Sequence, residues 1–168
     1  MPTVTITLGA QQAGNGYGPS TQSATPDKLS VQLSRGPQDI TFNLAVASGS
    51  PATTQMLFTQ NANGWGNIAP ITWKTITPSD VGFPPGWSAA QQAAFLAALQ
   101  TALNNIVVSS PANSPSTATL TLNPSTLEAG NGFQIDLPYT VNYWINVNGV
   151  SWGPQRFDPE VDILPGSK

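Results

Sequence analysis

The chain has 168 residues and a net charge of −3, and only 8% of its residues are charged, against about 25% in an average soluble domain. It contains no histidine and no cysteine, which excludes the usual general base, a Ser-His triad, disulfides and zinc–thiolate sites. The few basic residues are scattered, so we expect neither nucleic acid nor a membrane surface as a partner. This length predicts one domain spanning residues 1–168.

Apolar and polar residues alternate along much of the first half. Val4, Ile6 and Leu8 lie on one side of an extended segment, with threonines on the other. A period of two with many β-branched residues is typical of half-buried strands. Strands are therefore predicted in five segments: 4–8, 28–34, 40–46, 54–60 and 69–76.

The segment from 87 to 106 has a different composition, rich in alanine, leucine and glutamine, which favour helices. Ser88 followed by Gln91 has the spacing of a capping box. Phe95, Leu99 and Leu103 recur at helical spacing, so one face of the helix is apolar. We expect a helix at about 88–105, packed over one end or edge of the sheets.

The second half returns to alternation, and its clearest feature is a hairpin. After strands near 116–124 and 132–137, residues 139–147 alternate and end at Asn148-Gly149, the strongest short turn signal. The return strand begins at Val150. The chain as a whole predicts an all-β fold: an antiparallel, immunoglobulin-like β-sandwich with one inserted α-helix.

Three of the eight acidic residues, Asp158, Glu160 and Asp162, alternate within five positions of the last segment. In one strand they would project from one face about 7 Å apart per step. That spacing is too wide for all three to hold one calcium ion without other ligands. We interpret them as the charged side of an edge strand, protected by Pro159, and keep calcium as the alternative.

Five tryptophans give a second candidate site. Trp144 shares the asparagine-bearing side of its strand with Asn142 and Asn146, and Trp152 follows in a glycine-rich turn. If exposed, these four residues would form a patch able to stack on sugar rings or to anchor a protein interface.

The last thirty residues resemble a known family. "YTVNYWINVNGVSWGPQRFDPEVDILPG" is similar to the ending of the bacterial DP-EP family proteins and of the related inclusion-body proteins, and "PITW" at 70–73 is similar to an element in their middle. The resemblance implies an immunoglobulin-like β-sandwich, a cytoplasmic location and no established catalysis. It assigns no residue to a site.

These observations predict a non-enzymatic, self-associating structural protein of the inclusion-body or assembly-forming kind, because a surface with few charges repels its own copies weakly. One version has the N-terminal strand pairing with a neighbouring copy. The alternative is a carbohydrate- or protein-binding module that uses its aromatic residues, with calcium as an optional aid. The start "MPTVTITLGA" has no pattern of a secretory leader, so we expect a cytoplasmic protein or a mature fragment.

Overall fold

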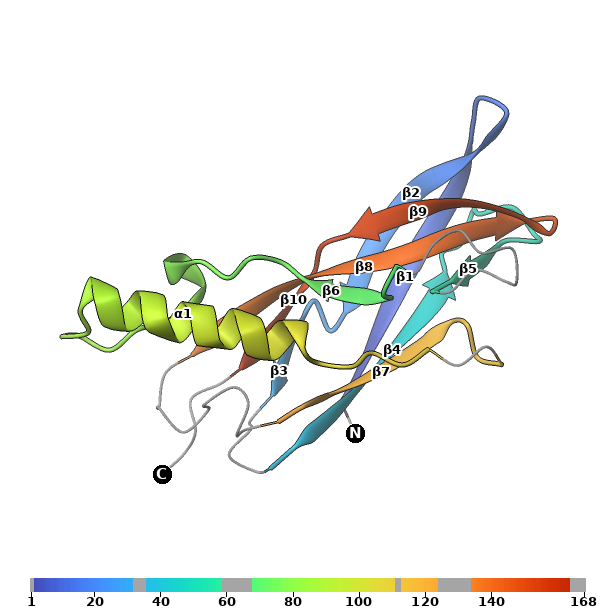
Figure 1. The fold of residues 1–168 in the computed structure, drawn as a ribbon. Coiled ribbons are helices and arrows are strands. Elements are labelled where there is room, and N and C mark those ends of the chain that lie inside the picture. Colours follow the sequence, from blue (N-terminus) through green and yellow to red (C-terminus); the bar gives the residue numbers. More distant parts are fainter. Residues whose placement is uncertain (1, 32–35, 59–67, 111–112, 124–133, 164–168) are drawn as a thin grey trace.

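The computed structural model describes residues 2–31, 36–58, 68–110, 113–123 and 134–163. The described chain forms two β-sheets and one α-helix (Figure 1). It therefore confirms the predicted all-β sandwich with one helix at the level of its layers. Its strands account for most of the segments in which the sequence alternates.

One sheet has four strands in the order β2-β1-β4-β7. The strands are β1 (Thr3–Ala13), β2 (Gly16–Thr25), β4 (Gln38–Val46) and β7 (Thr117–Leu122). β1 and β2 form a hairpin, whose far end extends beyond the rest of the molecule at the upper right of Figure 1. β1 lies between β2 and β4; β2 pairs with it to its end, whereas β4 pairs with it only from Thr3 to Leu8. The segment 3–8 is therefore paired on both edges within the chain, and pairing of the N-terminal strand with a neighbouring copy stays a prediction for the rest of β1.

The other sheet has six strands built around a long central strand. They are β3 (Lys28–Val31), β5 (Gln55–Leu57), β6 (Ile71–Trp73), β8 (Ile135–Val147), β9 (Val150–Phe157) and β10 (Glu160–Ile163). β9 and β10 follow one another along one edge of β8, and β5 and β6 pair with it on the other edge. β3 lies outside β10.

The core forms between the sheets because one side of each alternating strand is apolar. Val4, Ile6 and Leu8 of β1 are buried in the same cluster as Val141 and Ile145 of β8. Removing such side chains from water stabilises the fold by about 1.5–3 kcal/mol for each fully buried residue. The alternation seen in the sequence is thus the pattern of one core between two sheets.

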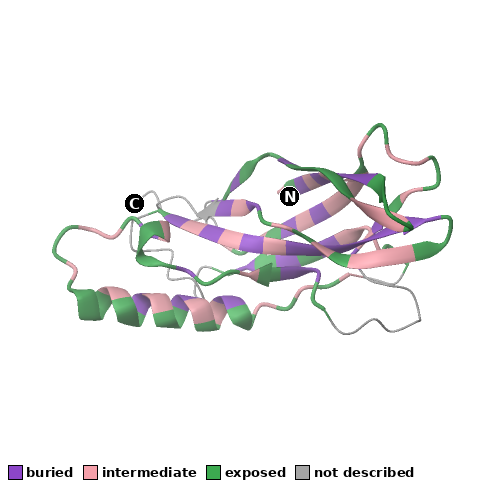
Figure 2. Cartoon of the chain, turned by 90° about the horizontal axis from the view of Figure 1, so that it is seen from above, coloured by how far each residue is buried: buried purple, intermediate pink, exposed green. Residues whose placement is uncertain are grey.

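The helix α1 (Ala89–Asn104) begins and ends where the sequence predicts. The Ser88 hydroxyl accepts the backbone N–H of Gln91, and the Gln91 side chain accepts the N–H of Ser88. Phe95, Leu99 and Leu103 are buried in the core cluster, and the outer side of the helix is exposed (Figure 2). A short 3₁₀ turn, η2 (Pro78–Asp80), precedes it.

The helix closes one side of the sandwich. Its last residues lie beside β7 of the four-stranded sheet and beside β6 of the six-stranded sheet. The Gln100 side chain accepts the backbone N–H of Ile76, just after β6, at 2.8 Å. This placement confirms the expectation of a helix packed along an edge.

The purely antiparallel arrangement expected from the sequence is wrong. β1 runs parallel to β4, and β10 runs parallel to β3. Hairpins force sequence neighbours such as β8 and β9 to run antiparallel, but these two pairs join strands that are distant in sequence. A period of two carries no information on the direction of such a pair.

Candidate functional site

The C-terminal hairpin carries most of the residues that the sequence selects. Asn148 and Gly149 form its turn, with φ angles of 55° and 82°, as expected for the short connection of a hairpin. β8 and β9 then pair from Val147 and Val150 to Val141 and Phe157. The predicted hairpin is confirmed.

Trp144 is not on the surface. Only 2% of it is exposed, and the neighbouring Asn142 and Asn146 are 4% and 7% exposed. Both edges of β8 are paired at this point, to β5 and to β9, and every residue from Val141 to Val147 is buried on either side of the strand. The expected exposed aromatic patch is therefore wrong, because a strand at the centre of a sheet can be covered on both faces.

The side chains of Asn142 and Asn146 form hydrogen bonds with backbone and side-chain groups of the same chain. The Asn142 amide donates to the carbonyl oxygen of Ala69 at 3.0 Å, and Asn146 donates to the hydroxyl of Ser151 at 3.0 Å. The Asn146 side chain also accepts the N–H of Gly149 in the turn. The Asn146 bonds hold the hairpin together, whereas the Asn142 bond joins β8 to the residues before β6, and neither amide is presented to a ligand.

Trp152 lies on the opposite side of the sheet from Trp144. It pairs in register with Ile145, a core residue, and directly opposed residues project from the same face. Its ring meets Tyr17 of β2 edge-to-face with centroids 5.2 Å apart. The two tryptophans therefore cannot form one binding patch.

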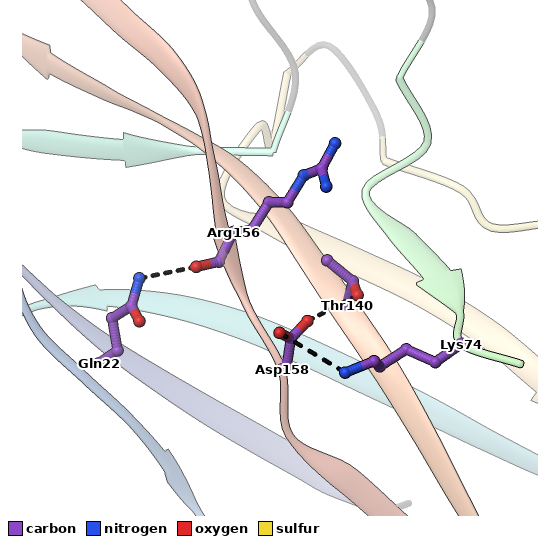
Figure 3. Close-up of polar contacts among 5 residues, drawn as sticks. All are labelled: Gln22, Lys74, Thr140, Arg156 and Asp158. Carbon is purple, nitrogen blue, oxygen red and sulfur yellow. Dashed lines mark hydrogen bonds and ion pairs between the residues drawn. The ribbon is translucent and has the colours of Figure 1, made fainter.

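The three acidic residues of the last segment are separated from one another. Asp158 lies between β9 and β10; it accepts the Thr140 hydroxyl at 2.7 Å, and its carboxylate is 3.7 Å from the Lys74 ammonium (Figure 3). Glu160 lies in β10 and forms an ion pair with Lys28 at 2.8 Å. Asp162 follows two residues later in the same strand, opposite Asp136 of β8.

Asp158 and Glu160 thus have different partners and do not share one ion site, and the side chain of Asp162 lies outside the described residues. Within the described ranges, no group of three acidic, histidine or cysteine side chains is placed to hold a metal. The edge-strand interpretation is also wrong, since β10 is paired on both sides, to β3 and to β8. The carboxylates of Asp158 and Glu160 instead lie beside two different lysines, Lys74 just after β6 and Lys28 of β3.

Two tyrosines of β8 lie deep in the fold. Burial raises the pKa of Tyr139 well above its ordinary value. Burial also raises the pKa of Tyr143, although a hydrogen bond from Gln22 acts in the opposite direction. Gln22 of β2 donates both to the Tyr143 hydroxyl and to the carbonyl oxygen of Arg156, each at 2.9 Å (the second in Figure 3), and so joins the two sheets at one corner.

The outer face of the four-stranded sheet is a surface that residue-by-residue reasoning missed. It presents one side chain type repeatedly, and its members are exposed or half-buried. We call this set the threonine face: Thr3, Thr5, Thr7, Ser23, Thr25, Thr41, Asn43, Thr117, Thr119 and Thr121. The alternating threonines of "TVTIT" and "TATLT" indicate such a surface, but each segment taken singly indicates only the polar side of a strand.

The threonine face has almost no charge. Asp39 is the one acidic or basic residue in β1, β2, β4 and β7, and its carboxylate accepts the Thr121 hydroxyl at 2.6 Å. Thr117 donates to the Asn43 side chain across the same strand pair at 3.1 Å. The described surface is thus polar and regular, with Asp39 as its one charge, and it resembles neither a catalytic cleft nor an ion site.

Comparison with known proteins adds no relative. No family model, no curated protein and no solved structure matches the chain. Among the helices of the described residues, none has the length and apolar character needed to cross a membrane.

Proposed function

We propose that the chain is a non-enzymatic structural protein that associates with itself through its four-stranded sheet. The observation that carries this proposal is the distribution of charge. The strands of that sheet contain a single charged side chain, Asp39. The two described ion pairs, Lys28–Glu160 and Lys74–Asp158, both lie on the side of the six-stranded sheet.

Sheets that must remain single usually protect their edges with lysine, with inward charges or with covering segments. β2 is an edge strand of the four-stranded sheet, and its sequence "GYGPSTQSAT" has no charge. Among the described residues, Pro19, the local bulge between Leu8 and Ala10, and the hydrogen bonds of Gln22 to the other sheet oppose pairing there. Weak repulsion and an uncharged edge together favour association.

The proposed absence of catalysis rests on the available side chains. Histidine and cysteine are missing from the sequence, and Asp158 and Glu160 are engaged with lysines. We do not propose a carbohydrate-binding role. Stacking on a sugar requires an exposed ring, and Trp144 is buried.

An immunoglobulin-like fold and a relation to the DP-EP and inclusion-body proteins are part of the same proposal. Two packed sheets joined by hairpins support an immunoglobulin-like relation, from which the parallel pairs β1–β4 and β3–β10 depart. The resemblance of the last thirty residues to DP-EP and inclusion-body proteins agrees with an accumulating cytoplasmic protein.

Light scattering coupled to size-exclusion chromatography tests the proposal. The 17.5 kDa chain is expected to give a mass that rises steadily with loading concentration. A mass that stays at the monomer value over the whole accessible concentration range would contradict self-association.

A further inference from the structure

The outer edge of β7 is only partly paired. In an antiparallel pair, successive residues direct their backbone groups alternately toward and away from the partner strand. Thr119 directs its groups away from β4, because it exchanges two hydrogen bonds with Ser109, at 2.9 and 2.8 Å. Thr121, two residues later, must direct its N–H and C=O to the same side. No bond to those two groups is found among the described residues.

A groove opens at this point. If the pairing continued, Val107 would lie opposite Thr121, but the bridge between Ser109 and Thr119 is isolated and the two segments diverge. The space between them and the end of α1 measures about 470 Å³. Val107 is 82% exposed at its border, and none of the described residues that line it is charged. We call this space the β7 groove; its walls include Ala102, Ile106, Val107, Ser109, Thr119 and Thr121.

The far end of the β1–β2 hairpin offers a complementary strand. β4 pairs with β1 only as far as Leu8, so none of the described strands lies beside the stretch from Gln11 to Ala13 on that side. The N–H of Ala10 points there and donates to the Ser50 hydroxyl at 3.1 Å. By the same alternation, the backbone groups of Gln12 point outward. Gln11, Gln12 and Ala13 are exposed and uncharged.

We propose that residues 11–13 of one copy lie in the β7 groove of a second copy, with the backbone of Gln12 paired to that of Thr121. The proposal rests on the proposed self-association and names its contact. An extended backbone supplies the donor and the acceptor that Thr121 lacks, and the uncharged side chains of Gln11, Gln12 and Ala13 suit a groove whose described lining carries no charge. Because hairpin and groove are different surfaces, the contact is heterologous, and repeated contacts build a ring or an open filament.

Two matched valine variants test this contact. Val107→Lys places a charge at the border of the groove, and Val150→Lys places the same charge on a valine that is 55% exposed at the β8–β9 turn. A charge that must be desolvated on association is costly. Val107→Lys is therefore expected to weaken association at least about tenfold, measured by sedimentation velocity, and Val150→Lys to leave it within about twofold.

The outcomes separate the two proposals. If the wild-type chain associates and both variants associate equally well, the groove is not the contact, while self-association stands. If the wild-type chain is monomeric at every concentration, self-association fails and the groove contact fails with it. Equal weakening by both lysines would also overturn the groove, since it would show a general effect of charge.

The lack of cysteine allows a second, positional readout. Gln12→Cys and Thr121→Cys proteins are prepared separately, mixed and oxidised. Paired residues in an antiparallel ladder lie about 5.5 Å apart at Cα, which is within the range of a disulfide. The mixed dimer is expected to exceed that from a control mixture of Val150→Cys with Thr121→Cys. Equal yields from the two mixtures would overturn the pairing.

Discussion

The indole of Trp144 lies directly against Gly153 of the neighbouring strand. A Cβ at position 153 would lie 3.0 Å from Cδ1 of Trp144 and 3.1 Å from the carbonyl oxygen of Tyr143. The φ angle of Gly153 is 151°, in a region that other residues rarely adopt. The register of the β8–β9 pair shifts at the same place, so this bulge makes room for a buried ring.

Gly153→Ala is therefore expected to lower the free energy of unfolding by about 2–3 kcal/mol, through backbone strain and overlap with the indole. Urea denaturation followed by tryptophan fluorescence measures it. Gly18→Ala is the matched control, because a Cβ there meets nothing closer than 3.8 Å; its expected change is within about 0.5 kcal/mol. Equal losses for the two variants would contradict the close packing of Trp144 on Gly153.

Gln22 joins the edge of one sheet to the other. Gln22→Ala removes hydrogen bonds to Tyr143 and to the carbonyl of Arg156, so a loss of about 1–2 kcal/mol in the free energy of unfolding is expected. Gln11→Ala removes only a 3.4 Å contact within the β1–β2 hairpin and is expected to cost less than about 0.5 kcal/mol. A Gln22→Ala protein as stable as wild type in thermal and urea unfolding would show that the corner contributes nothing.

Stability is expected to decline in alkali because of two tyrosines. Burial raises the pKa of Tyr139 and of Tyr143, whereas tyrosines in the unfolded chain ionise near pH 10. Above that pH the unfolded state loses its protons first, so the contribution is complete below about pH 10 and is lost as the pH rises toward the folded pKa. The expected slope is up to about 1.4 kcal/mol per pH unit for each tyrosine.

Urea unfolding from pH 8 upward, compared with Tyr139→Phe, measures this dependence. The variant is expected to show a shallower decline above about pH 10, since phenylalanine cannot ionise. Tyr17→Phe is the control, because Tyr17 lies at the half-buried hairpin end beside Trp152. An unchanged slope in Tyr139→Phe would contradict the assignment.

Calcium is expected to leave the protein unchanged. Asp158 faces Lys74, and Glu160 faces Lys28, so each carboxylate already has a cation and the two belong to different clusters. Any ion that bound only the folded state would raise its melting temperature. Differential scanning calorimetry with millimolar calcium and with a chelator should give equal midpoints, and a reproducible rise with calcium alone would restore the metal interpretation.

The sequence predicted the features that depend on local pattern. The capping box at Ser88, the Asn148-Gly149 turn and the inward side chains of β1 and β8 all appear in the structure, because each is determined by neighbouring residues. β2 was missed, since in "GYGPSTQSAT" only Ala24 is buried and no alternation reveals the strand.

The candidate site was predicted less well, because the exposure of its residues depends on how the strands of the sheet are arranged. Whether Trp144 is exposed depends on which strands lie beside β8. Those strands are β9, which follows β8 directly, and β5, which comes from the first half of the chain. The same holds for the acids: Asp158 and Glu160 meet Lys74 and Lys28, which are distant in sequence. The alternation of residues predicts which side chains share one face of a strand. Which segments cover that face depends on the topology of the sheets.

The salt dependence of self-association tests the central claim most directly. The screening length falls from about 10 Å at 0.1 M salt to about 3 Å at 1 M, which weakens contacts made by charges and leaves contacts between neutral surfaces intact. Sedimentation velocity of the wild-type chain is therefore expected to show a concentration-dependent association that stays as strong, or becomes stronger, at the higher salt. A chain that remains monomeric at both, or complexes that dissociate as salt is added, would contradict association through the neutral four-stranded sheet.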